Sequence, residues 1–407
     1  MMKPKIRFNG FTDDWEQRKL SELVQIERGG SPRPIEAYIT DAPNGLNWVK
    51  IGDAPVQGHY ITKTAEKIKP EGLSKTRQVQ PGDLILSNSM SFGKPYIMGI
   101  DGCIHDGWLL IRDNKKAFDL TFLYHLLGTP QMLSQYKSLA AGSTVNNLNK
   151  ELVGGTIVTI PNLDEQQVLG QYLESLDNLI TLHQRKCDGL KKLKKYMLQN
   201  MFPQNGEKTP KIRFQGFINA WEQRKLGELT IYRNGTGHEE KQSESGKYEL
   251  INLNSISIDG GLKPSGKFID EETETLLKDD LVMVLSDVGH GDLLGRVAII
   301  PENNRFVLNQ RVALLRNNSS VDIKYLFSYI NAHQIYFKKQ GAGSSQLNIS
   351  RGSVENFEVL LPHKDEQKKI GKYLSSIDNL ITLHQRKVEQ MKNLKKYMLQ
   401  NMFPAEK

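Results

Sequence analysis

The chain contains the same pair of sequence segments twice. Residues 165–203 return at 366–404, where 28 of 39 positions match at an offset of 201 residues. Residues 4–23 return at 210–229, where 15 of 20 positions match. The stretches between these segments diverge strongly and can be aligned only with insertions. An internal repeat of this length predicts two copies of one structural unit joined in a single chain.

The matched ends and the divergent middles indicate two different roles. Repeated ends are expected of a scaffold that does one job twice, whereas divergent middles are expected of two heads that act on different targets. A decayed gene duplication without such a division is the alternative, but decay alone would not spare the ends selectively. The predicted parts are a first head, a first long helix, a linker, a second head and a second long helix, at 4–163, 164–203, 204–209, 210–362 and 363–404.

The repeated tail predicts a long helix in each copy. Its apolar positions recur in alternating steps of three and four residues, which is typical of a coiled-coil seam. We expect the helices to end at Pro203 and Pro404, to pack on each other, and to have a pseudo-twofold axis if the pairing is antiparallel. The seam is expected to continue through Leu193 and Leu394. The other predicted seam residues are Leu173, Leu176, Ile180, His183, Leu190, Leu374, Ile377, Ile381, His384 and Met391.

Polar residues on these helices have more than one interpretation. His183 and His384 occupy seam positions, where setting the register of the pairing is favoured over binding a metal. Lysines follow the histidines in both copies. They either meet phosphates or a partner protein, or form a solvated helix face. These lysines are Lys191, Lys192, Lys194, Lys195, Lys392, Lys395 and Lys396.

The two heads show a mixture of strand and helix patterns. Aliphatic and β-branched runs that end at glycine or proline signals predict strands. The strand patterns lie at 83–86, 155–160 and 357–361, and the helical patterns lie near 122–139 and 323–338. The predicted fold class is therefore α+β: two similar mixed domains separated by two long antiparallel coiled-coil helices, related by a pseudo-twofold internal repeat.

Polar, glycine-containing loops lie at matching places in the two heads. Base edges are read by Asn, Gln, Arg, Lys, Ser and Thr, and phosphates by hydroxyl and backbone N–H groups. Such loops are common, so the signal is their paired occurrence. The candidate DNA-contacting residues of the first head are Ser87, Asn88, Ser89, Ser91, Lys94, His105, Trp108, Ser143, Thr144, Asn146 and Asn147. Those of the second head are Ser286, His290, Arg296, Asn309, Gln310, Arg311, Ser344, Ser345, Gln346, Asn348 and Arg351.

Composition limits the class of protein. A net charge of +8 permits contact with a polyanion but is also common in proteins without nucleic-acid partners. Cys103 and Cys187 are too far apart for a disulfide framework or a zinc-ribbon spacing, which fits a reducing compartment. The apolar runs are too short to span a bilayer, and the N-terminus lacks the apolar core of a signal peptide. We expect a cytoplasmic protein with no membrane partner and no metal site.

The sequence offers no recognisable catalytic constellation. It lacks the Pro-Pro dipeptide of a base-amine methyltransferase motif and the Gly-Lys-Ser/Thr loop of a motor ATPase. Ser91 and Lys94 match a Ser-x-x-Lys pattern, as do Ser134 and Lys137, but the companion motifs of serine acyl-transfer enzymes are missing. We therefore expect a chain that is not an enzyme.

The chain resembles the specificity (S) subunits of type I restriction–modification systems. The resemblance covers nearly the whole chain and rests on Trp-Glu-Gln-Arg-Lys-Leu at 15–20 and 221–226, on the Pro-x3-Glu-Gln patterns at 161–166 and 362–367, and on the helices that follow. It implies two target-recognition domains, each reading one half of an interrupted DNA site. Two methylation (M) subunits and the motor-nuclease (R) subunits would assemble around them. S-adenosylmethionine, ATP and magnesium would be used by those partners, with no cofactor bound by this chain.

Two other functions stay open on the residues alone. The chain could be a coiled-coil interaction scaffold whose heads bind proteins or peptides. It could also be an acyl-transfer enzyme that uses Ser91 and Lys94. A salt-dependent gel shift with the methylation subunit present separates the DNA-binding hypothesis from both.

Overall fold

The computed structural model describes residues 3–88, 92–140, 147–204, 206–271, 274–343 and 346–404. It divides into two compact units, and the first is not one continuous piece of chain. The first unit comprises Met1–Arg185 and His384–Lys407, and the second comprises Lys186–Leu383. Each unit therefore contains one head, the first part of one long helix and the last part of the other.

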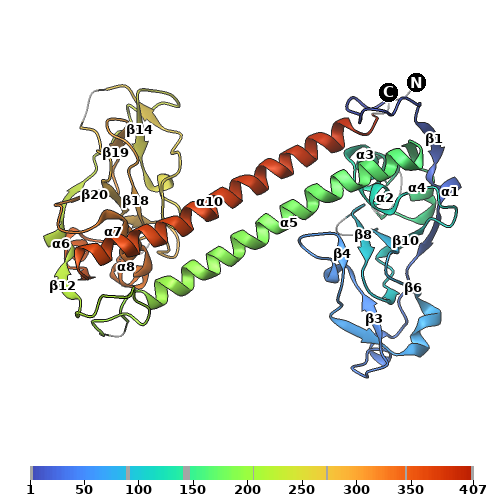
Figure 1. Cartoon of the computed structure of the whole chain (residues 1–407), viewed down its shortest axis with the longest axis horizontal. Helices are drawn as coiled ribbons and strands as arrows, with labels where there is room; N and C mark the ends of the chain where they lie inside the picture. Colours follow the sequence, from blue (N-terminus) through green and yellow to red (C-terminus); the bar gives the residue numbers. More distant parts are fainter. Residues whose placement is uncertain are drawn as a thin grey trace. The chain divides into compact units, whose positions relative to one another are not determined.

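The two long helices are α5 (Leu163–Asn200) and α10 (Lys364–Asn401), and they lie side by side within each unit (Figure 1). In the first unit, Asp177 of α5 contacts Lys395 of α10, whereas His183 contacts His384. Because the numbering rises along one helix while it falls along the other, the pairing is antiparallel, as the repeat predicted.

The helix seam follows the prediction except near its end. Leu173 is fully buried, and His183 Nδ1 lies 2.8 Å from His384 Nδ1. However, Leu193 and Leu394 are 37% and 39% exposed. Strict alternation of three- and four-residue steps explains this exposure. After Leu190 a step of four residues is due, and it places Lys194 in the seam, where Asp378 of the facing helix pairs with it. The other predicted seam residues are all buried or half-buried: Leu176, Ile180, Leu190, Leu374, Ile377, Ile381, His384 and Met391.

The first head is built on a five-stranded sheet of order β2-β10-β7-β8-β4 and a four-stranded sheet of order β5-β3-β9-β6, with a further pair, β1-β11. Its strands are β1 (Glu16–Lys19), β2 (Gln25–Arg28), β3 (Leu46–Val49), β4 (Tyr60–Ile61), β5 (Glu66–Ile68), β6 (Arg77–Val79), β7 (Leu84–Ser87), β8 (Pro95–Met98), β9 (Gly102–Ile104), β10 (Trp108–Arg112) and β11 (Ile157–Ile160). Its helices are α1 (Leu20–Leu23), α2 (Leu120–Leu127), α3 (Pro130–Ala140) and α4 (Lys150–Gly154), with 3-10 turns η1 (Ile35–Ala37), η2 (Ile51–Asp53) and η3 (Pro70–Lys75).

The second head repeats this plan with sheets of order β13-β20-β16-β18 and β15-β14-β19 and with the pairs β12-β22 and β17-β21. Its strands are β12 (Glu222–Lys225), β13 (Thr230–Asn234), β14 (Tyr248–Ile251), β15 (Phe268–Ile269), β16 (Leu281–Val284), β17 (Ser286–Asp287), β18 (Val297–Ile299), β19 (Phe306–Leu308), β20 (Val312–Asn317), β21 (Leu347–Asn348) and β22 (Glu358–Leu361). Its helices are α6 (Leu226–Leu229), α7 (Ile323–Ala332), α8 (Gln334–Gln340) and α9 (Arg351–Glu355), with the turn η4 (Leu253–Ser255). Each predicted head helix is thus two helices, α2 and α3 or α7 and α8.

The repeated segments hold each head to the long helices. In the first unit, Arg7 Nε donates to Glu165 Oε1 of α5 at 2.7 Å. The C-terminal Phe403 packs in the same core, with its ring 6.3 Å from Trp15 and 5.6 Å from Phe122. Gly170 lets α5 approach α2 closely, because a Cβ there would lie 2.4 Å from Thr121 Oγ1. The segment that follows α10 therefore completes the core of the first unit.

The second unit repeats these contacts with its own residues. Arg213 Nε donates to Glu366 Oε1 of α10 at 2.7 Å. Phe202, which follows α5, packs edge-on against Tyr325, with ring centroids 5.7 Å apart. Gly371 allows α10 the same approach to α7. The matched ends of the sequence are therefore the residues that join head to helix.

Candidate nucleic-acid interface

A polar cavity of about 320 Å³ in the second head is lined by four of the predicted contact residues. The antiparallel pairing of β17 with β21 places Ser286 opposite Asn348, and Ser286 Oγ donates to Asn348 Oδ1 at 2.5 Å. Arg311 and Arg351 line the same cavity. The fold thus gathers into one place residues that the sequence put in three separate loops.

The two arginines differ in how they are held. Arg311 has a positive φ of 66° in the turn before β20 and is exposed. Its guanidinium forms no hydrogen bond or ion pair with any residue that the structure describes. Arg351 lies over the ring of Tyr232 at 5.2 Å and pairs with Glu355 at 2.9 Å. An unpaired guanidinium beside an Asn side chain is suited to base edges and phosphates. Sequence reasoning missed Tyr232.

Two neighbours of Arg311 serve the head itself. Asn309 is 7% exposed, and its Oδ1 accepts a hydrogen bond from the backbone N–H of His238. Gln310 Nε2 donates to the carboxylate of Glu239. In this structure their polar groups hold the 234–239 loop against the turn before β20.

The remaining described candidates of the second head lie outside this cavity. Arg296 Nη1 donates to the backbone carbonyl of Asn331 at 3.2 Å, and desolvation by burial lowers the pKa of Arg296. His290 is exposed. Gln346 Nε2 is buried without a hydrogen-bond partner among the described residues. Arg296 therefore has a structural role in joining strand to helix.

In the first head, three of the predicted contact residues are buried in the fold. Trp108 and Ser87 are 0% exposed, and Asn88 is 3% exposed. Ser87 Oγ accepts a hydrogen bond from the backbone N–H of Lys94, and Asn88 Nδ2 donates to the carbonyl of Asp106 at 2.8 Å. The prediction is corrected for these side chains, because they pack and bond within the head instead of facing solvent.

Three others are available at the surface of the first head. His105 is part-exposed, and its Nδ1 accepts from the Gly107 backbone N–H at 2.9 Å. Lys94 is exposed, with its Nζ 4.9 Å from the centre of the Tyr96 ring. Asn147 is exposed as well. The predicted residues Ser89, Ser91, Ser143, Thr144, Asn146, Ser344 and Ser345 lie outside the described residues.

The candidate loops occupy the same position in both heads. In the first, the backbone N–H of Leu148 donates to Asn88 O at 3.1 Å, and in the second that of Ile349 donates to Leu285 O at 2.9 Å. Leu148 and Ile349 are related by the 201-residue offset. The chain just after β7 or β16 is therefore tied to the segment before the small helix α4 or α9.

The helix lysines line a second cavity, within the first unit. It has a volume of about 420 Å³, and Lys392, Lys395 and Lys396 of α10 line it together with Lys94 of the head. Lys395 Nζ lies 2.6 Å from both carboxylate oxygens of Asp177. Lys395 therefore forms an ion pair with the facing helix α5.

Both copies of the repeat match the model of one protein family. Residues 12–192 and 219–393 match the model of the type I restriction modification DNA specificity domain, once for each copy of the repeat. The chain belongs to this family. The match covers both heads together with most of each long helix, so the family's repeating unit is the unit seen here.

Relatives in this specificity family match the chain over nearly its full length. The chain is 24% identical to the putative type I restriction enzyme MjaX specificity subunit of Methanocaldococcus jannaschii, over 97% of this chain and 94% of the relative. It is 22% identical to the MjaVIII specificity subunit of the same organism, over 95% and 91%. It is 21% identical to the StySPI specificity subunit of Salmonella potsdam, over 88% and 81%.

Solved structures of the family share the fold. One is the S subunit of a type I restriction–modification system from M. genitalium. Its alignment with this chain covers 100% of each of the two chains, with a TM-score of 0.68 and 16% identity. A chain from a structure of type I restriction–modification complex assembly covers 97% of this chain and 98% of its own, with a TM-score of 0.54 and 16% identity. Among the described residues, no helix is long and apolar enough to cross a membrane.

Proposed function

We propose that this chain is the sequence-specific DNA-binding subunit of a type I restriction–modification complex, in which each head reads one half of a bipartite target. The observation that carries the proposal is the placement of polar loops at the same position in two otherwise divergent heads. An exposed, unpaired Arg311 beside Asn348 supplies donors suited to a base edge in the second head. Family membership supports the same proposal.

The chain is proposed to act without catalysis of its own. Methyl transfer, ATP hydrolysis and cleavage belong in this proposal to two M subunits and to R subunits that join through the complex. S-adenosylmethionine, ATP and magnesium are used by those partners, in the cytoplasm. Incubating the purified chain with labelled S-adenosylmethionine and DNA should give only background label, and adding M subunits should give transfer. Label incorporated by the chain alone would contradict this part.

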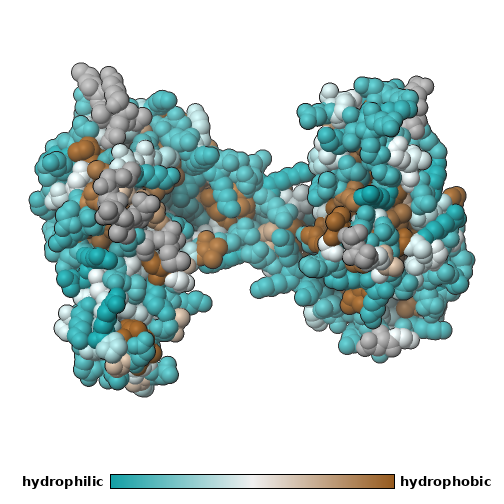
Figure 2. Space-filling view, turned by 180° about the vertical axis from the view of Figure 1, so that it is seen from behind, coloured by the Kyte–Doolittle hydropathy of each residue, from teal (hydrophilic) through white to brown (hydrophobic). Residues whose placement is uncertain are grey.

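The long helices are proposed to carry the M-subunit docking surface. Apolar residues reach the surface along these helices (Figure 2). Leu179 and Leu182 are 41% and 46% exposed, and their repeat partners Leu380 and Leu383 are 43% and 46% exposed. Exposed apolar residues that recur in both copies are expected where one partner binds twice. Leu182→Asp should lower the number of M subunits per chain from two to one in native mass spectrometry, as should Leu383→Asp. If a double variant with Leu182→Asp and Leu383→Asp still binds two M subunits, the assignment of the docking surface is contradicted.

The DNA-reading role is tested by a matched pair of arginine variants in the second head. Arg311→Ala removes the unpaired guanidinium of the cavity, whereas Arg305→Ala removes an exposed arginine that pairs with Glu302 instead. Arg311→Ala should weaken binding to the specific site more than binding to random DNA, as measured with the M subunits present at fixed salt. Equal losses in the two variants would contradict the assignment of the cavity.

A further inference from the structure

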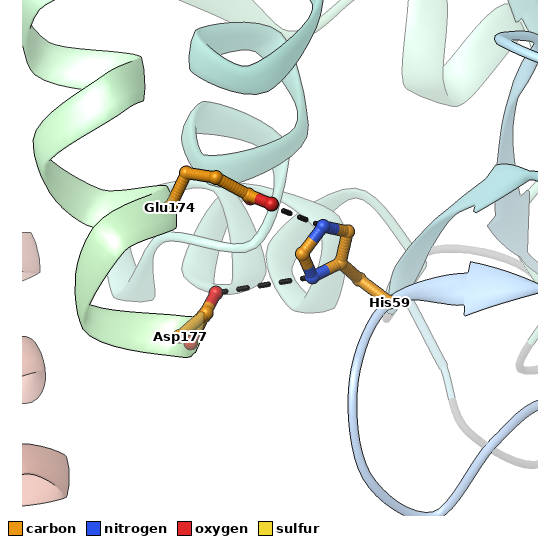
Figure 3. A group of neighbouring side chains, drawn as sticks. All are labelled: His59, Glu174 and Asp177. Carbon is orange, nitrogen blue, oxygen red and sulfur yellow. Dashed lines mark ion pairs between the residues drawn. The ribbon is translucent and has the colours of Figure 1, made fainter. Parts of the chain in front are cut away.

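Three potential metal ligands meet where the first head touches α5 (Figure 3). His59 precedes β4 of the head, and Glu174 and Asp177 lie one turn apart on α5. His59 Nε2 lies 3.1 Å from Glu174 Oε2, and His59 Nδ1 lies 4.0 Å from Asp177 Oδ2. One ligand atom from each residue lies within 4.8 Å of the other two.

One atom in each of two of these residues is buried without a hydrogen-bond partner among the described residues. His59 is 4% exposed, and its Nε2 has no hydrogen-bond partner among the described residues. Glu174 Oε2 is buried and likewise unbonded. The two atoms face each other at ion-pair distance without hydrogen-bond geometry. Buried polar atoms of this kind are rare in folded proteins and call for a partner.

Asp177 also contacts residues outside the cluster. Lys395 Nζ lies 2.6 Å from both oxygens of Asp177. His125 Nε2 lies 3.9 Å from Asp177 Oδ2 and has no hydrogen-bond partner among the described residues. Glu174 lies outside that ion pair, and His59 Nε2 is the group that faces its buried Oε2.

We propose that His59, Glu174 and Asp177 bind one divalent transition-metal ion, with zinc or manganese as the best match. Imidazole nitrogen together with carboxylate oxygen favours these ions over calcium, which prefers oxygen alone. Ligand atoms about 2.1 Å from a zinc ion lie roughly 3–4 Å from one another. One atom from each of the three residues lies within 4.8 Å of the other two, so rotation of these side chains would bring the three atoms around one ion. Lys395 can retain one oxygen of Asp177 as an outer partner while the other binds the ion.

The neighbouring cavity supplies a route to this site. His59 and Asp177 line the cavity of about 420 Å³, so an ion can enter and water can occupy a remaining coordination position. The ion would connect the head to α5 through ligands from both. Its role is to fix the orientation of the first head on its helix.

The second unit provides an internal control. It keeps the helix ion pair, because Lys194 Nζ lies 2.6 Å from Asp378 Oδ1. However, Ser375 stands where the first copy has Glu174, and the described strands of its main sheet end at β18 with no equivalent of β4. We therefore expect one ion per chain.

The experiment is a cobalt titration of the full chain, freed of affinity tags and of metal, followed by competition with Zn²⁺. Co²⁺ should bind at one equivalent with visible absorption bands, and Zn²⁺ should remove those bands. Glu174→Ser installs the residue that the twin helix carries, so the helix should fold normally. This variant and His59→Gln should each weaken binding by at least about ten-fold. Ser375→Glu, the matched change in the second unit, should leave the stoichiometry at one.

Three results would overturn the proposal. The first is the absence of saturable binding by a chain whose circular dichroism shows it to be folded. The second is unchanged affinity in both Glu174→Ser and His59→Gln. The third is loss of binding on His183→Gln with retention in His59→Gln, which would place the ion at the His183–His384 pair. All three readouts are independent of DNA binding, so they can fail while the proposed function stands.

Discussion

The two heads share one framework and differ at its edges. The main sheet of the first runs β2-β10-β7-β8-β4, and that of the second runs β13-β20-β16-β18, so β4 has no equivalent among the described strands of the second. The second has instead the pair β17-β21 beside its polar cavity. The contacts that join head to helix are repeated closely, as in Arg7–Glu165 and Arg213–Glu366, both at 2.7 Å. Duplication therefore preserved the junctions, while the edges of the sheets changed.

Exchanging a head should produce the largest effect. If the heads are independent readers on a common framework, replacing residues 20–160 with the same region of a related protein should change one half of the methylated site completely. The other half should be unaffected, because its head and junction are untouched. Sequencing of methylated bases measures both halves at once. A change in both halves would show that the heads are not independent.

Breaking a junction should cost stability equally in the two units. Glu165 and Glu366 are 1% and 0% exposed in their side chains and pair with Arg7 and Arg213. Removing one partner of a buried pair leaves the other uncompensated, so Glu165→Ala and Glu366→Ala should each lower the free energy of unfolding by about 3 kcal/mol. Urea unfolding measures this.

The control for the junctions is an exposed pair. Glu22 pairs with Arg18 at 2.8 Å, and their side chains are 46% and 40% exposed. Glu22→Ala should have a much smaller effect than either junction variant, because solvent screens exposed ion pairs. Clearly unequal effects at Glu165 and Glu366 would mean that the two junctions are not equivalent.

Recognition should be sensitive to single residues in the second head. Arg311→Ala should reduce discrimination between specific and random DNA by about 1–3 kcal/mol, the range for one base contact. Asn348→Ala should give a loss in the same range, although Asn348 also accepts from Ser286. Competition binding with M subunits present would quantify both. In the first head, Asn147→Ala tests whether the equivalent position reads DNA.

Acid should weaken both heads by a smaller amount. Desolvation by burial lowers the pKa of His125 and of His333. The unfolded chain binds a proton at each below about pH 6.5, whereas the folded chain resists it. Stability should therefore fall as pH decreases below about 6.5, by at most about 1.4 kcal/mol per pH unit for each histidine. His125→Asn and His333→Asn should each reduce this slope, as measured by urea unfolding between pH 7 and pH 5.

Several parts of the fold were predictable because they depend on local periodicity. The antiparallel helix pair and the facing histidines His183 and His384 follow from the repeat and its heptad pattern. The seam after Leu190 was missed, because Lys194 is polar in sequence and becomes a seam residue only by pairing with Asp378. Burial of Trp108 was also missed, since a polar loop pattern does not reveal which side chains turn inward.

The candidate sites were predictable only in part. Arg311 and Asn348 were identified by residue type, but their meeting in one cavity depends on the pairing of β17 with β21. The cluster of His59, Glu174 and Asp177 gave no sequence signal, because its members are 115 and 3 residues apart and come from two different elements. Spacing within one helix can place Glu174 near Asp177, but only the docking of the head brings His59 to them.

The sequence by itself determined the two-copy organisation, the long helices and the regions in which the heads differ, because repeats and heptads depend on residues close together along the chain. Only the tertiary structure decided that Phe403 completes the core that contains Trp15, and that the first unit is assembled from two separate stretches of chain. The physical reason is that burial and ion pairing between distant residues depend on their meeting in space. Sequence position specifies which residues can meet, and packing specifies which of them do.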